Sequence, residues 1–300
     1  MTNKRIPPLI VILGFFIVAT LFPREVSSGQ DDDVENNLRI PQVNHVQIIV
    51  TEDGSSLVGR IIWIGKDEIQ FETDLGVVTI PIAKIEGIQE VPKSSIKTGE
   101  YWFPDPNSTR LFFAPTGRNL KKGGGYFCSY YLFFPGVAYG ITDNFSIGGG
   151  VSLFPGFDLS EQLFYFTPKF GLKVSSSFNF SAGALLVRAP DGDDSQLAGI
   201  LYGMGTVGPA DGSLTIGLGY GFVGSDFADR PVIVVGGNRR LSKEIAILSE
   251  NWIMPDMDTP VVSLGLRFFG KSLSGDFALI NTLKDPIFPG VPYTNFVYNF

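Results

Sequence analysis

Charged side chains are scarce in this chain of 300 residues, and cysteine and histidine occur only once each. Asp, Glu, Lys and Arg together make up 18% of the residues, whereas an ordinary soluble domain has roughly 25%. The single Cys128 excludes an intramolecular disulfide, a cysteine-based zinc site and a CxxC redox motif. The formal net charge of −7 and the lack of long basic tracts make nucleic acid an unexpected partner.

Glycine and phenylalanine are the residue types that stand out by their abundance. The chain has 36 Gly and 26 Phe, yet its mean hydropathy is only +0.19, too low for a bundle of membrane helices. High glycine and aromatic content with few charges suits a β-sheet in which apolar and small residues alternate. We therefore expect an all-β fold.

Residues 1–29 have the pattern of a secretory signal peptide. Lys4 and Arg5 precede an uninterrupted run of apolar and small residues from Leu9 to Phe22. The run has the length of a signal-peptide hydrophobic region, about 7–15 residues, and is shorter than the roughly 20 residues that span a bilayer. Small residues at 27–29 supply a cleavage point; an uncleaved membrane anchor is the alternative. Residues 30–43 then form an acidic linker.

Residues 44–92 predict a small β module of five short strands. The expected strands are His45–Thr51, Leu57–Ile64, Glu68–Thr73, Val77–Ile80 and Gly87–Val91. Five strands with these turns resemble an SH3-like or Sm-like small barrel, a likeness of fold that does not define a function. Behind a signal peptide the module would lie in the periplasm, where it would bind a partner protein or support the following domain. We expect His45 to be structural and residues 93–107 to be a linker.

Residues 108–300 alternate with a period of two, which predicts strands. From Phe145 to Leu153 the odd positions are large and apolar, except Gly149, and the even positions are Gly or Ser. Ser213 to Phe222 repeats the pattern, with apolar even positions and Ser, Thr or Gly at the odd positions. A soluble sandwich would carry many charges on its second face. Gly, Ser, Thr and Asn on that face instead suit the lumen of a transmembrane barrel whose apolar face contacts lipid.

The connections between the expected strands support an antiparallel up-and-down barrel. Short turns alternate with longer loops rich in Pro, Asp and Gly, as in outer-membrane barrels. An even strand number places both barrel ends at the periplasmic side. The twelve expected strands are roughly 109–115, 125–141, 144–154, 162–174, 178–188, 196–207, 213–223, 231–239, 244–253, 260–269, 275–282 and 293–300.

The C-terminus predicts recognition by the bacterial machinery that assembles outer-membrane barrels. Phe296, Tyr298 and Phe300 share one face of the last expected strand, and phenylalanine is the final residue. This pattern resembles the terminal assembly signal of such barrels. The segment from Leu111 to Leu153 also resembles a recurring stretch of uncharacterised outer-membrane β-barrel proteins of Gram-negative bacteria. That resemblance implies location and fold, but no function.

Two glycine motifs resemble nucleotide-binding sequences but lie in expected strands. Gly265 to Ser272 matches the P-loop pattern, and Gly219 to Gly224 matches the dinucleotide fingerprint. Both sites require a helix after the glycines, and neither segment has a helical pattern. The barrel region contains no histidine, so a histidine-dependent catalytic site cannot form there. We therefore expect no enzymatic site and no cofactor.

The candidate site is a set of polar residues on the expected lumen face: Lys169, Lys173, Glu250 and Arg267. They either pair within a packed lumen, the interpretation we favour, or line a polar path. The many glycines on this face favour a narrow or filled interior. Asp191, Asp193 and Asp194 cluster in one loop; they indicate a solvated surface, and at most a weak calcium site.

The sequence thus favours a non-enzymatic, porin-like outer-membrane barrel that forms a small pore or serves as a structural or interaction protein of the cell envelope. Its expected partners are outer-membrane lipid, the barrel assembly machinery and a periplasmic protein that binds residues 44–92. Two alternatives remain open. One is a secreted soluble β-barrel or sandwich that holds a ligand in its interior, and the other is an enzyme that uses carboxylates.

Overall fold

The computed structural model describes residue 34 and residues 38–188, 196–255 and 257–300. The chain forms two compact units, Met1–Tyr101 and Trp102–Phe300. The expected signal peptide, half of the acidic linker and the aspartate cluster at 191–194 lie outside the described residues. No helix in the described part of the chain is long and apolar enough to span a membrane.

The first unit is built on a five-stranded antiparallel sheet with the strand order β4-β3-β2-β1-β5. Its strands are β1 (His45–Thr51), β2 (Ser56–Ile64), β3 (Glu68–Thr73), β4 (Gly76–Pro81) and β5 (Ile85–Pro92), with the 3-10 turn η1 (Ile82–Lys84) before β5. A second 3-10 turn, η2 (Lys93–Ser95), leads to the short hairpin of β6 (Ile96–Lys97) and β7 (Glu100–Tyr101). The predicted five strands are therefore present.

Isoleucines and one phenylalanine form one buried cluster of this unit, and Val46, Ile48 and Val91 form another. Ile49, Ile61 and Phe71 are fully buried at its centre. Gln47 is also fully buried, and its amide group is satisfied because Nε2 donates to the Arg39 carbonyl and Oε1 accepts from the Ile61 N–H. His45 is the first residue of β1, with Nδ1 3.3 Å from the Val43 carbonyl oxygen.

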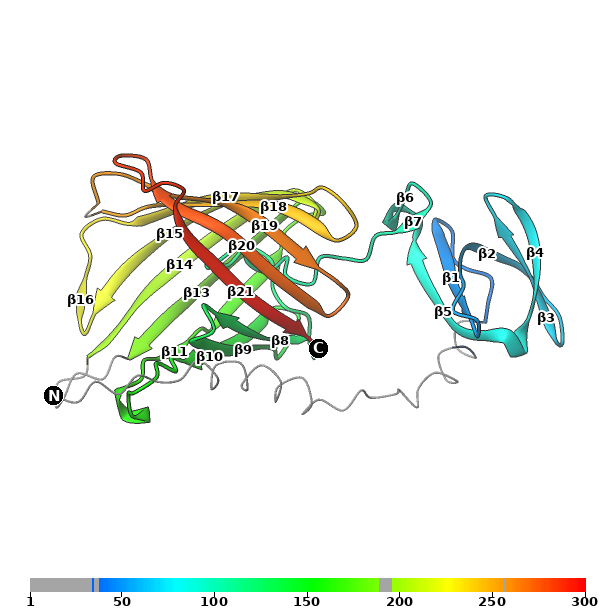
Figure 1. Ribbon diagram of the computed structural model, residues 1–300, viewed down its shortest axis with the longest axis horizontal. Helices are drawn as coiled ribbons and strands as arrows, with labels where there is room; N and C mark the ends of the chain where they lie inside the picture. Colours follow the sequence, from blue (N-terminus) through cyan, green and yellow to red (C-terminus); the bar gives the residue numbers. More distant parts are fainter. Residues whose placement is uncertain (1–33, 35–37, 189–195, 256) are drawn as a thin grey trace. The chain divides into compact units, whose positions relative to one another are not determined.

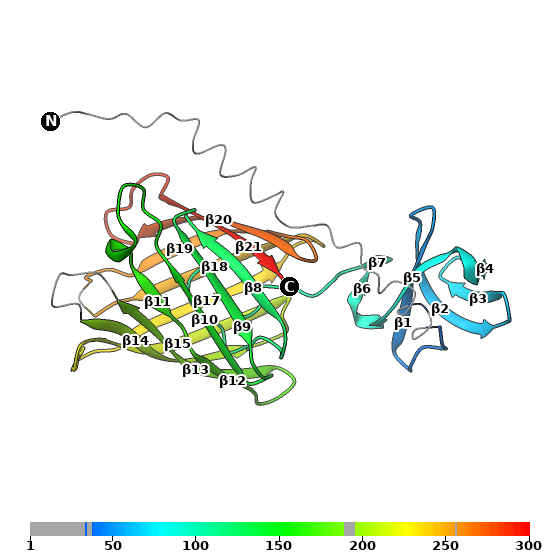
Figure 2. The same ribbon diagram turned by 90° about the horizontal axis from the view of Figure 1, so that it is seen from below.

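The second unit is a closed antiparallel barrel of twelve strands (Figures 1 and 2). Each strand pairs with the next along the chain, and β21 pairs with β8 to close the sheet. One strand is interrupted and consists of β11 and β12, while the two-residue β16 pairs with β15 outside the closed path. The strands are β8 (Gly125–Tyr130), β9 (Phe134–Gly140), β10 (Phe145–Val151), β11 (Phe164–Phe166), β12 (Lys169–Lys173), β13 (Phe178–Arg188), β14 (Leu197–Val207), β15 (Gly212–Val223), β16 (Asp226–Phe227), β17 (Val232–Arg240), β18 (Ile245–Ile253), β19 (Val261–Phe269), β20 (Leu273–Thr282) and β21 (Val291–Asn299).

The predicted number of strands is confirmed, but two of the predicted strands are wrong. Residues 109–115 form no strand and contain only an isolated bridge from Arg110 to Pro115. The single strand predicted at 125–141 is instead β8 and β9, joined by a tight turn. Tyr131 and Leu132 occupy this turn with φ of 51° and 65°, a conformation for which Gly or Asn would be the usual signal. The two errors cancel in the count.

The connections confirm the predicted asymmetry of the two barrel ends. At one end, which we call the short-turn end, the strands from β9 to β20 are joined by turns of three or four residues. At the opposite long-loop end, the connections have seven to twelve residues, except for the turn between β8 and β9. The C-terminus lies at the short-turn end, where Phe300 and Gly125 exchange backbone hydrogen bonds.

The outward face of the barrel is apolar along its whole circumference. Large side chains such as Phe166, Ile216 and Phe277 are about half exposed there, with exposed fractions of 46%, 51% and 51%. Among the strands that the structure describes, only Arg188 and Arg239 place a charge on this face. They lie at or next to the ends of β13 and β17, at opposite rims of the barrel.

The two glycine motifs lie in strands, as the alternation predicted. Gly265 to Phe269 belong to β19, and the turn through Lys271 leads directly into β20. Gly219 and Gly221 belong to β15. Neither motif is followed by a helix, so neither has the geometry that binds phosphate groups.

Candidate functional site: the occupied barrel lumen

A segment of the chain itself fills much of the barrel lumen. Residues 103–121, which we call the inner hairpin, precede β8 and reverse direction at Leu111–Ala114, where the Leu111 N–H donates to the Ala114 carbonyl at 2.8 Å. The hairpin enters at the short-turn end, where Phe103 packs edge-on against Phe269. Its turn lies near the other end, where Phe113 stacks on Tyr130. The hairpin therefore runs along most of the lumen.

Glu250 on β18 holds the turn of the inner hairpin. Its Oε2 accepts hydrogen bonds from three consecutive backbone N–H groups, those of Phe112, Phe113 and Ala114, at 2.8, 3.0 and 3.0 Å. The other oxygen, Oε1, accepts from Trp252 Nε1 at 2.7 Å. Glu250 is 1% exposed, so these donors replace the water that a buried carboxylate would otherwise require.

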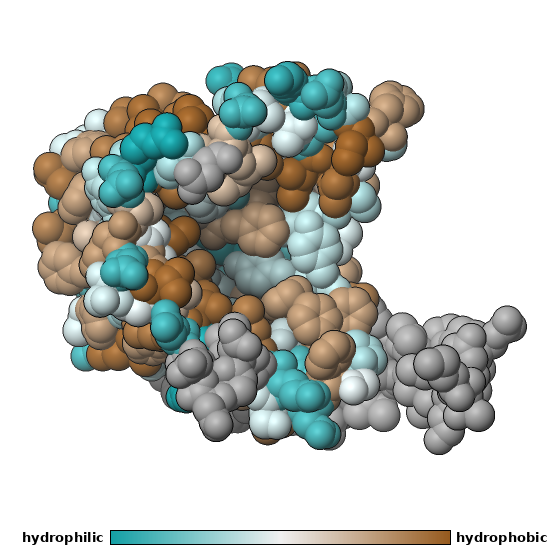
Figure 3. All heavy atoms as spheres, turned by 90° about the vertical axis from the view of Figure 1, so that its left-hand side faces the viewer, coloured by the Kyte–Doolittle hydropathy of each residue, from teal (hydrophilic) through white to brown (hydrophobic). Residues whose placement is uncertain are grey.

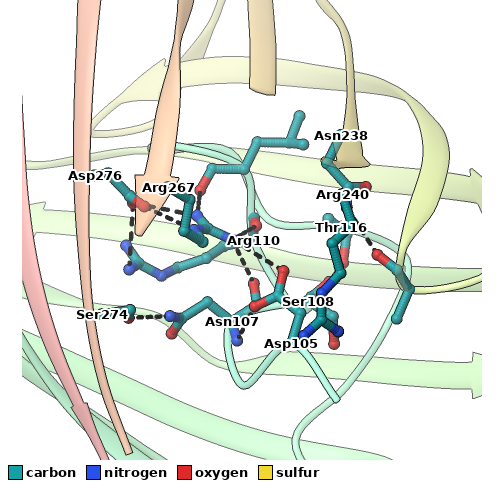
Figure 4. Close-up of polar contacts among 12 residues, drawn as sticks. Asp105, Asn107, Ser108, Arg110, Thr116, Asn238, Arg240, Arg267, Ser274 and Asp276 are labelled. Carbon is teal, nitrogen blue, oxygen red and sulfur yellow. Dashed lines mark hydrogen bonds and ion pairs between the residues drawn. The ribbon is translucent and has the colours of Figure 1, made fainter. Parts of the chain in front are cut away.

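Arg267 on β19 holds the entering strand of the hairpin (Figure 4). Its guanidinium donates to the carbonyls of Asn107, Arg110 and Leu111. It also pairs with Asp276 on β20, with Nε to Oδ1 at 2.6 Å, and lies 3.6 Å from Asp105 of the hairpin. A buried cation with two carboxylates and three carbonyls is well compensated, whereas loss of one member would leave an unpaired charge.

Four further contacts link the hairpin to the barrel wall. Asn107 Nδ2 donates to Ser274 Oγ on β20. Arg110 Nη2 lies 3.7 Å from Asp276 Oδ2, and Nη1 donates to Tyr130 at 3.1 Å. Near the entry point, Arg240 at the end of β17 donates to the Phe103 carbonyl. The hairpin is thus bound through polar contacts to strands on several sides.

The returning strand of the hairpin is fixed by side chains from the opposite wall. Lys169 on β12 donates to the carbonyls of Thr109 and Arg118. Ser181 on β13 donates to the Thr116 carbonyl, and Thr206 on β14 accepts from the Gly117 N–H at 2.8 Å. Because the hairpin has no strand partner, these wall side chains satisfy backbone groups that would otherwise be buried without hydrogen bonds.

Glycines on the lumen face make room for the hairpin. A Cβ at Gly236 would lie 2.5 Å from Leu111 Cδ1, and a Cβ at Gly140 would lie 2.1 Å from the Lys121 carbonyl oxygen. Both distances are below van der Waals contact. The small residues that alternate along the strands therefore match the cross-section of an occupied lumen rather than an open one.

Three of the four polar residues proposed from the sequence lie in the interior and contact the hairpin: Lys169, Glu250 and Arg267. Lys173 lies at the end of β12 and is exposed. Sequence reasoning missed Asp276 and the hairpin residues Asp105 and Arg110. Asp276 stands opposite Arg267 in the pairing of β19 with β20, and an opposite charge on adjacent strands was the signal that could have identified it.

A cavity of about 200 Å³ remains between the hairpin and the wall. Hairpin residues from Thr109 to Pro115 form one side, and strands from β8 to β18 form the other. Figure 3 looks at the long-loop end of the barrel, whose surface is hollowed at the centre. Within the described residues, no group of three or more His, Cys, Asp or Glu could hold a metal ion.

No family model matches this chain, and no curated protein matches its sequence. Among solved structures, a KdgM porin is similar with a TM-score of 0.41 and 11% identity, over 59% of this chain and 96% of the porin. A loop-deletion mutant of OmpT, an outer membrane protein of Vibrio cholerae, is similar with a TM-score of 0.32 and 10% identity, over 85% of this chain and 96% of that chain. A mutant of the Rh. blastica porin is similar with a TM-score of 0.32 and 9% identity, over 85% of this chain and 97% of the porin.

Proposed function

We propose that this protein is a non-enzymatic, porin-like barrel of the Gram-negative outer membrane, and that its inner hairpin closes the passage. The observation that carries the proposal is a closed twelve-stranded barrel, apolar outside, whose lumen is occupied by a polar-bonded segment of its own chain. The hairpin would have to shift for a solute to pass, because the cavity beside it is only about 200 Å³.

The outer surface supports residence in a membrane. Strands β13 to β21, apart from the two-residue β16, have nine to twelve residues, and a strand of about 9–11 residues crosses a bilayer when tilted. Charge on the outward face is confined to Arg188 and Arg239 near the rims, so the band between them meets the requirement of a hydrocarbon environment. The same band argues against a soluble barrel or sandwich, which would expose charges over its surface.

The first unit would lie in the periplasm, on the side of the short turns. Its strand order and the 3-10 turn before β5 are consistent with the SH3-like or Sm-like small barrel expected from the sequence. In this proposal the module binds a periplasmic protein or supports the barrel, and the expected signal peptide directs export. The outward-facing Phe296 and Tyr298, with Phe300, would be bound by the assembly machinery during insertion.

The proposal is tested by membrane extraction and solute flux. The protein should remain in the outer-membrane fraction until detergent is added, and the folded barrel should migrate differently from the heated protein in SDS gels. Proteoliposomes containing wild type should take up small solutes slowly, and those containing Glu250→Gln should take them up faster. The same exchange at Glu244→Gln, an exposed glutamate in the turn before β18, should leave uptake unchanged. A protein that stays in solution without detergent would contradict the proposal.

A purely structural or interaction role is the second candidate, and the filled lumen favours it. Hydrogen bonds between one hairpin and the side chains of many barrel strands are also what a barrel without transport would use to stabilise its interior. These strands are β12, β13, β14, β17, β18, β19 and β20. In that case the protein would still fractionate with the outer membrane, but uptake would stay at background in wild type and in Glu250→Gln alike.

A further inference from the structure

The cavity beside the inner hairpin is lined by positive charge that no carboxylate on its surface balances. Lys169 and Arg110 both line it and are only 8% and 4% exposed. Among the described residues that line the cavity, none is Asp or Glu. Arg110 has Asp276 behind it at 3.7 Å, but Lys169 forms no ion pair with any described residue. A buried ammonium without a counter-ion is costly.

Donor groups around the cavity remain unused. An ammonium has three N–H donors, and in the described structure Lys169 uses two, for the carbonyls of Thr109 and Arg118. The hydroxyls of Tyr126, Tyr165 and Tyr202 line the cavity and have no hydrogen-bond partner among the described residues. Some buried polar atoms, such as Arg110 Nε, have neither a hydrogen-bond partner nor accessible surface, and the three tyrosine hydroxyls are not among them. The three hydroxyls, on residues that line the cavity, are therefore not fully enclosed and are open to a ligand.

Much of the remaining lining is apolar. Ile200, Met204 and Val234 project from β14 and β17, and Trp252 and Phe113 add aromatic surface. Water in contact with this apolar surface makes no favourable interaction with it, whereas transfer of an apolar group from water to the surface is favourable. The cavity thus combines donors and positive charge with an apolar wall.

We propose that the cavity binds a small organic anion with an apolar body, of the size and chemistry of an aromatic carboxylate. A cavity of about 150 Å³ accommodates benzene, so the 200 Å³ here leaves room for a ring and a carboxylate. The carboxylate would accept from Lys169 and the tyrosine hydroxyls, and the ring would lie against Met204 and Trp252. The inference rests on the proposed function only where it makes this anion the solute that the barrel transports. Binding of the anion in the cavity does not require transport.

The test is titration of the purified, detergent-solubilised full chain with benzoate. Binding is followed by calorimetry and by the change in tryptophan fluorescence, in which Trp252 is the tryptophan that lines the cavity. Benzylamine and benzyl alcohol, of similar size, provide the cationic and neutral comparisons. Benzoate should bind more tightly than both. Benzoate should also slow the reaction of Cys128, which lines the same cavity, with a water-soluble maleimide. Equal affinity for the three compounds, or no binding of benzoate, would overturn the inference.

Two variants identify the binding groups. Lys169→Met should weaken benzoate binding by about 10- to 100-fold, the loss expected for a hydrogen bond to a charged group, with little change for benzyl alcohol. Lys173→Met removes the same charge from the exposed end of the same strand and should bind benzoate as wild type does. Tyr202→Phe, which retains the ring, supplies the test if Lys169→Met does not fold, and should weaken benzoate about 3- to 10-fold.

The outcomes separate this inference from the proposed function. Benzoate binding without solute flux in any variant would support the anion site and contradict the transport role. Flux without selective benzoate binding would leave the transport role intact and overturn the anion site.

Discussion

The most informative prediction is that Glu250→Gln, which replaces the carboxylate with an amide of the same shape, releases the inner hairpin. In Glu250→Gln the amide has one oxygen and one NH₂ group, but the carboxylate now accepts from four donors, three at Oε2 and one at Oε1. If the amide oxygen faces the three backbone N–H groups, its NH₂ opposes the Trp252 N–H. At least one hydrogen bond is lost, and the other three then have a neutral acceptor in place of a charged one.

The magnitude follows from the strengths of these bonds. Hydrogen bonds to charged groups contribute about 1.5–3 kcal/mol and neutral ones about 0.5–1.5 kcal/mol. One hydrogen bond is lost and three are weakened, and the surroundings relax in part. The free energy required to open the hairpin should therefore fall by about 2–4 kcal/mol. That change raises the population of the open hairpin by about 30- to 1000-fold.

Cys128 is a natural reporter of this opening. It is the only cysteine in the chain, it is 3% exposed, and it lines the cavity that the hairpin covers. When closing is faster than modification, the labelling rate by a water-soluble maleimide is proportional to the open population. Glu250→Gln should therefore label about 30-fold faster or more, and Glu244→Gln at the wild-type rate. Equal rates for wild type and Glu250→Gln would refute the role assigned to Glu250.

Three further predictions concern the network, the glycines and the first unit. Arg267→Met should destabilise the barrel by about 3–5 kcal/mol because it leaves the buried Asp105 without its cation and Asp276 with Arg110 alone, measured as a lower urea midpoint for loss of the folded band in gels. Gly236→Ala should cost about 1–3 kcal/mol by overlap with Leu111 Cδ1 and with the Ser249 carbonyl oxygen, each 2.5 Å from the added Cβ, and speed Cys128 labelling. Gly221→Ala, with nothing nearer than 3.9 Å, should do neither. Glu90 accepts from the backbone N–H of Gln42 and from Arg39, which holds the pKa of its carboxyl below the ordinary 4.5. This contribution is fully present above that pH and is lost as the pH falls through the lowered pKa. The difference in unfolding midpoint between wild type and Glu90→Gln should therefore shrink in acid.

The barrel could be predicted from sequence because its determinants are local. Alternation in segments such as Phe145–Leu153 specifies which side chains face outward, and turn composition specifies which connections are short. The same alternation placed Lys169, Glu250 and Arg267 on the lumen side. The tight turn at Tyr131 and Leu132 was missed because both residues adopt positive φ without the usual Gly or Asn.

The inner hairpin could not be predicted because its contacts are remote in sequence. Glu250 and Phe112 are separated by 138 positions, and nothing in the run of Leu111 to Ala114 distinguishes a buried turn from a short strand. The excess of glycine on the lumen face did indicate a narrow or filled interior. It could not indicate which segment fills the space, since a glycine leaves room for any nearby group.

Planar-bilayer conductance of the refolded protein is the most direct test of a membrane barrel closed by its own hairpin. Wild type is compared with a variant in which residues 103–121 are replaced by a flexible Gly-Ser linker, after both have been shown to give the folded band in gels. The account predicts brief or no openings for wild type and long-lived conductance steps for the variant. The same behaviour in both proteins, whether conducting or silent, would contradict it.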